Sequence, residues 1–313
     1  MNNEMIATVS RTMMAAFFLV FSLGAQAGLQ EGMAAYKKGF YAIAMKELKP
    51  LADSGNATAQ YQIGLMYDYG RGVAVDNRAA AEWYHKAAEQ GEVKAQVNLG
   101  LMYGRGQGVK RDDKEAMSWY LKAAAQGDAD AQYDVGWMHD NGRGVPKNHK
   151  MAVEWYHKAA KQGHAKAQFN LGWMYSNGQG VERDYKEGMS WYLKAANQGY
   201  VKAQTNLGWM YEKGRGVAPD VHAAVEWYRK AAEKGYAVAQ FNLGMSYTRN
   251  QGVPVDLVQA YKWFNLAATA RHESARVYME EFEKVMSAEQ LENARLQAHE
   301  LMAKTGGVRD NPY

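Results

Sequence analysis

The sequence predicts an all-α fold, a solenoid of stacked helix pairs, on the strength of two observations. A 36-residue period runs through the middle of the chain without a slip in phase, and apolar residues recur at helical spacing in both halves of every copy. A fixed period between about 20 and 50 residues is typical of solenoids and repeat arrays. The copies begin at Ala59, Ala95, Ala131, Ala167, Ala203 and Ala239.

The second half of each copy is a predicted helix. Its apolar residues fall at i, i+3, i+4, i+7 and i+8 and so share one helix face. In the first copy these residues are Ala80, Trp83, Tyr84, Ala87 and Ala88. The Trp of this pattern returns at Trp119, Trp155, Trp191, Trp227 and Trp263.

Both ends of this helix carry recognisable signals. A side chain just before the helix can accept a hydrogen bond from a first-turn N–H, and the residues placed to do so are Asp76, Asp112, Asn148, Asp184, Asp220 and Asp256. Three residues after their caps, Glu115, Glu187 and Gln259 predict capping boxes. A glycine that can become left-handed closes the helix, at Gly91, Gly127, Gly163, Gly199 and Gly235.

The first half of each copy is a second predicted helix. Ala59, Ile63, Met66 and Tyr67 share one face. A glycine in the middle, Gly64 in the first copy, costs roughly 1 kcal/mol relative to alanine. We therefore expect a neighbouring helix to approach closely at this glycine.

The glycine-rich element between the two helices, GRGV or GQGV, predicts a turn. A nucleotide-binding loop would need a strand before the glycines, whereas here a helix precedes them. The turn instead uses glycine for its backbone angles.

Composition excludes several classes of function. Apolar residues make up 47% of the chain and charged residues 22%, which is typical of a folded protein. The net charge is +4 with both signs interspersed, so we expect no nucleic-acid partner. With no cysteine, the chain has no disulfide, thiolate metal site or Cys nucleophile.

The first 27 residues read as a signal peptide. Arg11 precedes an apolar run from Met13 to Leu23, and Ala25-Gln26-Ala27 is the small-x-small pattern of a cleavage site. We expect cleavage between Ala27 and Gly28. The alternative, a membrane anchor, would need about 20 apolar residues. The mature chain is therefore expected to be periplasmic or secreted, with no membrane anchor.

The repeated residues resemble those of a known family. The pattern A-x-x-x-L-G-x-x-Y, then G-x-G-V, then A-x-x-W-Y-x-x-A-A is similar to the Sel-1-like repeat, a relative of the tetratricopeptide repeat, from about Ala59 to Ala268. The resemblance implies a right-handed α-solenoid of antiparallel helix pairs. It also implies a protein that binds other proteins and has no chemistry of its own.

The pattern weakens at both ends of the array. Ala44, Leu48, Leu51 and Ala52 keep the second-helix spacing without the Trp-Tyr pair, which predicts a degenerate first repeat. Near the other end Asn250 and Arg271 replace turn glycines, and Ser287 with Gln290 opens a predicted capping helix. The expected segments are a signal peptide 1–27, a degenerate repeat 28–58, repeats 59–94, 95–130, 131–166, 167–202 and 203–238, a divergent repeat 239–274, capping helices 275–304 and a tail 305–313.

The histidines do not predict a metal site or a catalytic base. His85 and His157 hold equivalent positions 72 residues apart, too far to bind one ion, and we interpret them as solvated helix flanks. His139 stands where other copies have Tyr and is interpreted as a packing residue. A partial 72-residue period also pairs the copies at Gly106 and Gly178, and we favour duplication of repeat pairs over a ligand with alternating contacts.

Two positions opposite the apolar stripe of the first helix predict an aromatic ladder. At 100° per residue, positions 61 and 65 of the first copy fall near 200° and 240°, away from the partner helix. The candidate partner-binding residues are Tyr61, Leu65, Leu101, Tyr133, Trp137, Phe169, Trp173, Trp209 and Phe241. In stacked helix pairs the first helices line the concave side, so these residues form a predicted groove. The alternative is that they pack between repeats.

The functional hypothesis is an exported, non-enzymatic scaffold that binds a protein partner along this groove, with no cofactor. A binder of cell-wall glycan is the first alternative, because sugar faces also stack on aromatic rings. A hydrolase is the second alternative, although the HExxH, G-x-S-x-G and P-loop motifs do not occur. The cysteine-rich branch of the family has been linked to β-lactam-related activity, and this chain lacks those cysteines.

Overall fold

The computed structural model describes residues 26–305, which form helices joined by short turns. The chain divides into two compact units, and the division falls after Lys147. The first unit contains helical residues 26–37, α2 (Tyr41–Asp53), α3 (Ala57–Tyr69), α4 (Asn77–Glu89), α5 (Val93–Arg105), α6 (Asp113–Ala125) and α7 (Ala129–Asn141). The second contains α8 (His149–Lys161), α9 (Ala165–Asn177), α10 (Tyr185–Asn197), α11 (Val201–Lys213), α12 (Val221–Ala232), α13 (Ala237–Thr248), α14 (Leu257–Thr269), α15 (Glu273–Glu283) and α16 (Ala288–Thr305).

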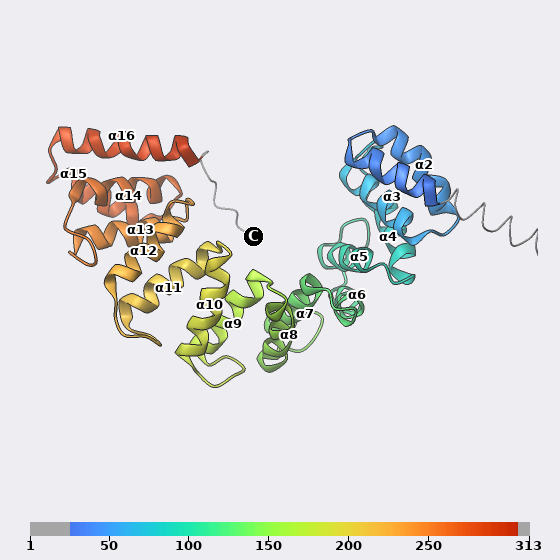
Figure 1. Ribbon diagram of the computed structural model, residues 1–313, viewed down its shortest axis with the longest axis horizontal. Coiled ribbons are helices and arrows are strands. Elements are labelled where there is room, and N and C mark those ends of the chain that lie inside the picture. Colours follow the sequence, from blue (N-terminus) through green and yellow to red (C-terminus); the bar gives the residue numbers. More distant parts are fainter. Residues whose placement is uncertain (1–25, 306–313) are drawn as a thin grey trace, which may run out of the picture. The chain divides into compact units, whose positions relative to one another are not determined.

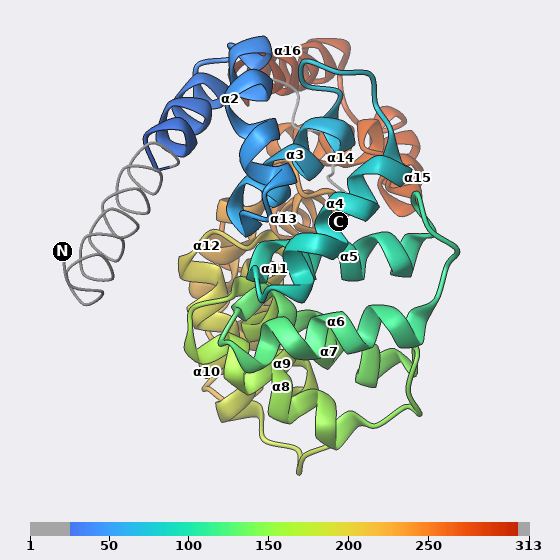
Figure 2. The same cartoon turned by 90° about the vertical axis from the view of Figure 1, so that its right-hand side faces the viewer.

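The predicted all-α fold of helix pairs is confirmed within each unit. Inside a unit, the first and second helices of a repeat pack together, as do α5 with α6 and α9 with α10, and each second helix also packs on the first helix of the next repeat. In Figure 2, α5, α6 and α7 run as successive layers of the first unit. The buried residues of each layer include the Ala, Leu and Met of the first helix and the Ala and Tyr of the second.

The expected close approach at the mid-helix glycine is confirmed. A Cβ added to Gly172 in α9 would lie 2.5 Å from the ring of Tyr192 in α10, and one added to Gly100 in α5 would lie 2.7 Å from the ring of Tyr120. These distances are too short for real contacts, so only glycine lets the Tyr ring lie against the first helix. The helix propensity lost at this position is offset by the packing of the ring.

The glycine-rich turn has the backbone angles that were expected and a second function. Gly108 and Gly180, each the second glycine of its turn, have φ of +67° and +72°. A Cβ on Gly180 would lie 2.4 Å from the backbone oxygen of His149, at the start of the preceding second helix. The turn of one repeat therefore rests directly on the backbone of the repeat before it.

A glutamine that follows the first Ala of each copy also joins consecutive repeats. Its side-chain amide donates to a carbonyl near the end of the preceding second helix, at 3.0 to 3.2 Å. Because these side chains are buried, the bond satisfies a polar group that would be costly to leave alone. The six bonds run from Gln60, Gln96, Gln132, Gln168, Gln204 and Gln240 to the carbonyls of Ala52, Ala88, Ala124, Ala160, Ala196 and Ala232.

The predicted N-caps are confirmed in all six copies, and the closing glycines have φ between +86° and +94°. A capping box also needs the N–H of the N-cap residue to donate to the side chain three residues later. That expectation was wrong at Glu115, Glu187 and Gln259. The N–H that the box would use is already bonded, since the N–H of Asp112 donates to the carbonyl of Tyr103 at 3.0 Å. A carbonyl in the last turn of the first helix thus accepts the hydrogen bond that was expected to go to Glu115.

Helices cover both ends of the described chain. Helical residues 26–37 pair with α2, whose Ala44, Leu48 and Ala52 are buried. At the other end α16 lies along α14 (Figure 1), and Ala298 packs against Trp263 and Leu266. The capping box before α16 is formed, because the N–H of Ser287 donates to Gln290 and the N–H of Gln290 donates to Ser287. Asn250 and Arg271 keep the positive φ of the glycines that they replace.

The apolar run from Met13 to Leu23 lies outside the described residues, and so does Ala25, the first residue of the cleavage pattern. Between residues 26 and 305, no helix combines the length and the apolar character that a membrane crossing requires.

Candidate interaction surface

A repeated surface feature of the described residues is a set of exposed tryptophans on first helices. Trp137 on α7 is 36% exposed, and Trp173 on α9 and Trp209 on α11 are each 42% exposed. Each Trp is followed by a buried Met that belongs to the apolar stripe, as Trp173 is by Met174. A residue one position from the stripe is turned about 100° away from it, which is why the indole remains in solvent.

The expected orientation of the other ladder position is wrong. Tyr61, Phe169 and Phe241 are half-buried and contact the aromatic ring of their own second helix. The ring centroids of Phe169 and Tyr192 are 5.6 Å apart, and those of Tyr61 and Tyr84 are 5.8 Å apart. Because the mid-helix glycine draws the Tyr ring across the first helix, that ring reaches position 61. These residues therefore pack between helices.

The remaining ladder positions are also more enclosed than the tryptophans. Leu65 packs against the core formed by α4 and α5, and Met245, which holds the position of Trp209 in the next copy, packs against Phe264 and its neighbours. Leu101 and Tyr133 are half-buried, and Thr205, which holds the position of Phe169 in the next copy, is buried with its hydroxyl donating to the carbonyl of Val201. Of the predicted ladder, the exposed part is thus the three tryptophans.

The charges next to these tryptophans differ between the two units. Next to Trp137, the Arg143 guanidinium lies 5.4 Å from the indole centroid and forms an ion pair of 2.6 Å with Asp113. The hydrogen bond from Arg143 lowers the pKa of the Asp113 carboxyl. In the second unit, α9 contains one charged residue, Lys166, and α11 contains Lys202, Glu212 and Lys213.

The tryptophans of the second helices fall into two groups. Trp119, Trp191 and Trp263 are buried, whereas Trp83, Trp155 and Trp227 are half-buried. All six have a nearby lysine ammonium, as Lys158 has at 3.5 Å from the centroid of Trp155. Buried and half-buried tryptophans thus alternate from one repeat to the next, so the burial of this residue follows the 72-residue period.

The interpretation of His157 as a solvated flank was wrong, because its side chain packs on the next repeat, whereas His85 contacts the next repeat and keeps 42% of its side chain exposed. The His85 ring packs edge-on against Trp119 and the His157 ring against Trp191, at centroid distances of 5.5 and 5.4 Å. The Nε2 atom of His157 also lies 3.0 Å from the hydroxyl of Tyr175. Burial lowers the pKa of His157, and Lys161 and Lys194 lower it further. His139 is half-buried, and burial lowers its pKa too.

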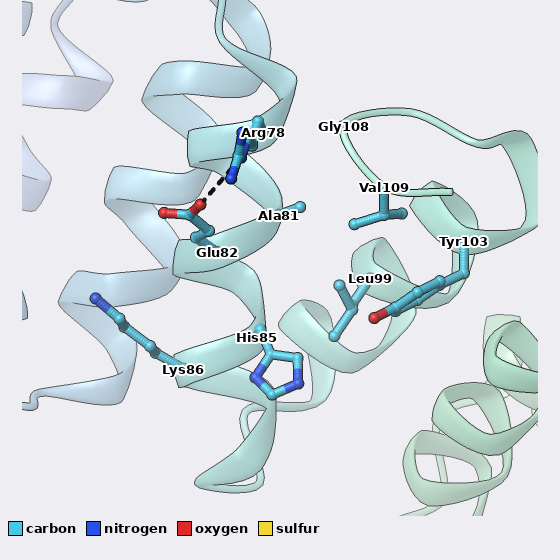
Figure 3. A pocket seen from close by; sticks show the side chains of 9 residues that line it. All are labelled: Arg78, Ala81, Glu82, His85, Lys86, Leu99, Tyr103, Gly108 and Val109. Atoms are coloured by element: carbon cyan, nitrogen blue, oxygen red, sulfur yellow. Dashed lines mark ion pairs between the residues drawn. The ribbon is translucent and has the colours of Figure 1, made fainter. Parts of the chain in front are cut away.

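A cavity of about 490 Å³ lies beside His85, between α4, α5 and the turn that follows α5 (Figure 3). Arg78, Glu82, His85 and Lys86 form its polar side, and Leu99 and Val109 form its apolar side. Among these lining residues the one carboxylate, Glu82, is 3.5 Å from Arg78, and His85 is 3.5 Å from Glu89.

Within the part of the chain that the structure describes, no three His, Cys, Asp or Glu side chains come together as metal ligands. The groups that are organised on the surface are indoles and ammonium groups. Such groups recognise apolar and anionic features of a binding partner.

Comparison with known proteins agrees with this architecture. The family described as the Sel1 repeat matches residues 57–92, 93–128, 129–164, 165–200, 201–236 and 237–272. The crystal structure of a Sel1 repeat protein from Oxalobacter formigenes is 36% identical with a TM-score of 0.69, over 77% of this chain and 96% of that one. A protective antigen of uropathogenic Escherichia coli strains is 31% identical with a TM-score of 0.43, over 90% and 77% respectively. No curated protein sequence matches the chain.

Proposed function

Because the chain belongs to the Sel1 repeat family, we propose that it is an exported, non-enzymatic scaffold that binds a protein partner. The Sel1 repeat fold typically mediates protein interactions. The exposed indoles of Trp137, Trp173 and Trp209 carry the proposal. Buried aromatic anchors supply much of the binding energy at protein interfaces, and Trp is prominent among them.

The proposed binding surface is the first-helix face rather than the cavity beside His85. A single exposed Trp on a soluble protein is ordinary, but here equivalent positions of three consecutive repeats expose one. Packing does not require this, since Leu65 and Leu101 hold the same position in two other copies. Within each unit, the proposed surface is the exposed side of that unit's own first helices.

Capture of a partner tests the scaffold and its alternative together. The purified protein is immobilised and exposed to envelope proteins in one arm and to purified cell wall in the other. Retention of a defined protein, lost when Trp173 and Trp209 are both replaced by alanine, supports the scaffold. Retention on cell wall with the same dependence on the two tryptophans would replace it by a glycan binder. Retention that is unchanged when both tryptophans are replaced would contradict the proposed surface.

Export is tested by the intact mass of the protein recovered from the periplasm or the medium. The proposal predicts a chain that begins at Gly28. A chain recovered in the membrane fraction that still contains the run from Met13 to Leu23 would contradict it.

A further inference from the structure

The two exposed tryptophans of the second unit are accompanied by lysines on the same helix faces. Lys166 precedes Trp173 by seven residues and Lys202 precedes Trp209 by seven. Seven residues turn a helix through about 700°, so each lysine lies within about 20° of its Trp, two turns nearer the helix N-terminus. Lys213 lies one turn beyond Trp209 on the same side.

These ammonium groups are not neutralised within the described part of the protein. Lys166 and Lys202 make no ion pair or hydrogen bond among the described residues. The only carboxylate on α9 or α11 is Glu212, which accepts a hydrogen bond from the Tyr228 hydroxyl at 2.9 Å and is 2.6 Å from Lys213. The positive charge at Lys166 and Lys202 is therefore available to a binding partner.

Two neutral amides near the tryptophans are already hydrogen-bonded within the protein. The Asn177 amide donates to the carbonyl of Trp173 at 2.8 Å, and the Asn206 side chain is hydrogen-bonded to the buried Tyr192 hydroxyl. What α9 and α11 offer instead is two indoles and unpaired ammonium groups, which together suit a carboxylate-bearing, partly apolar chain.

We propose that the α9–α11 face binds an acidic peptide segment, with Trp173 and Trp209 taking its apolar side chains and Lys166 and Lys202 taking its carboxylates. This inference rests on the proposed function and names the chemistry of the partner. Packed helices are about 10 Å apart and α10 contacts both α9 and α11. An extended peptide rises about 3.3 Å per residue, so roughly three to six residues separate the two carboxylates.

The face of α7 does not share this chemistry, although it also exposes a Trp. Its charged residues are Asp130, Asp134 and Asp140. The acidic segment is therefore assigned to the second unit, and Trp137→Ala is expected to leave its binding unchanged.

Selection from a phage-displayed library of random 12-residue peptides on the purified protein tests the proposal. The selected peptides are expected to carry at least two Asp or Glu residues together with aromatic or aliphatic residues. Their affinity should fall about tenfold or more in the double variant Lys166→Ala/Lys202→Ala and should weaken as salt is raised. The double variant Lys150→Ala/Lys186→Ala removes the same charge from second helices and should bind normally.

Each other outcome contradicts a specific part of the account. Neutral peptides that bind only when Trp173 and Trp209 are present would overturn the acidic segment and leave the scaffold in place. Peptides that bind without regard to either Trp, or no enrichment at all, would overturn both. Binding of soluble peptidoglycan fragments that depends on Lys166 and Lys202, with no selected acidic peptide, would assign the face to a glycan.

Discussion

The side-chain amide of Gln198 donates to Oε1 of Gln168 at 2.7 Å, and Gln168 in turn donates to the carbonyl of Ala160 at 3.1 Å. Gln198 also donates to the carbonyl of Gly163 at 2.9 Å. We call these hydrogen bonds the Gln relay. They join one repeat to the end of the preceding second helix and to the glycine that closes that helix. The same relay is formed by Gln126 with Gln96.

The relay is broken one repeat later, which leads to a stabilising substitution. Lys234 stands where Gln198 stood, and its ammonium donates to the carbonyl of Gly199. Oε1 of Gln204 is buried without a hydrogen-bond partner among the described residues. Lys234→Gln is expected to supply the missing donor and raise the free energy of unfolding by about 0.5–1.5 kcal/mol.

Urea denaturation of both proteins measures this difference. Lys234→Met serves as the control, because it removes the charge without adding a donor and should give no gain. A Gln variant that is no more stable than the Met variant would show that the relay contributes nothing at this interface.

The contact of Gly180 with the preceding repeat predicts a large effect of a single methyl group. Gly180→Ala places a Cβ against the backbone oxygen of His149, which cannot move as a side chain can, and it adds the strain of positive φ. We expect a loss of more than about 2 kcal/mol in the free energy of unfolding.

Gly163 is the matched control. It has φ of +91° but open space around its Cβ position, so Gly163→Ala should cost about 1 kcal/mol from the backbone alone. Urea denaturation measures the loss of unfolding free energy in both variants. Equal losses would mean that the close contact between the turn and the preceding repeat does not add to the cost of Gly180→Ala.

The position of His157 predicts a loss of stability in mild acid. Burial lowers the pKa of His157 below its usual value of 6.5, so the folded state favours the neutral ring. For a group with a lowered pKa in the folded state, its stabilising contribution is complete above pH 6.5 and is lost as the pH falls through the lower, folded pKa. The groups that face it are Tyr175, Lys161, Glu187, Trp191 and Lys194.

Thermal melts at about pH 7.5 and about pH 5 measure the effect. The melting temperature of the parent protein should fall more between these values than that of His157→Leu, since Leu holds this position at Leu121 and Leu193. His85→Leu is the matched control, because it makes the same substitution at the equivalent position of another repeat, where the side chain is 42% exposed. If His157→Leu retains the full pH dependence, another group is responsible for it.

Local signals in the sequence were sufficient for the helices, the N-caps and the closing glycines. Each of these features depends on residues within one turn of each other, and the 36-residue period repeats the same signal six times. The close approach at Gly172 was also predictable, because glycine in a helix interior needs a compensating contact.

The contacts between repeats were harder to predict. The angle of position 61 on a helical wheel did not reveal that the ring of Tyr84 crosses the helix to meet Tyr61, because a wheel contains one helix only. The Gln168 relay and the edge-on contact of His157 with Trp191 likewise depend on the distance between neighbouring repeats. The recurring Gln of each copy was a visible signal for the first of these contacts.

The central claim is that exposed first-helix tryptophans bind a partner while second-helix tryptophans hold the fold. Trp173→Ala and Trp209→Ala should change the free energy of unfolding by less than about 1 kcal/mol. Trp191, which is 6% exposed, should cost about 3–5 kcal/mol when replaced by alanine. Trp155 holds the same second-helix position as Trp191 but is half-buried, so its replacement should cost less.

The most direct measurement is the affinity of the captured partner for the parent protein and for Trp173→Ala, with a urea denaturation curve of each. The account predicts a loss of affinity of about thirtyfold, equivalent to about 2 kcal/mol, with the denaturation curve nearly unchanged. A denaturation curve that shifts as far as that of Trp191→Ala, or an unchanged affinity, would contradict it.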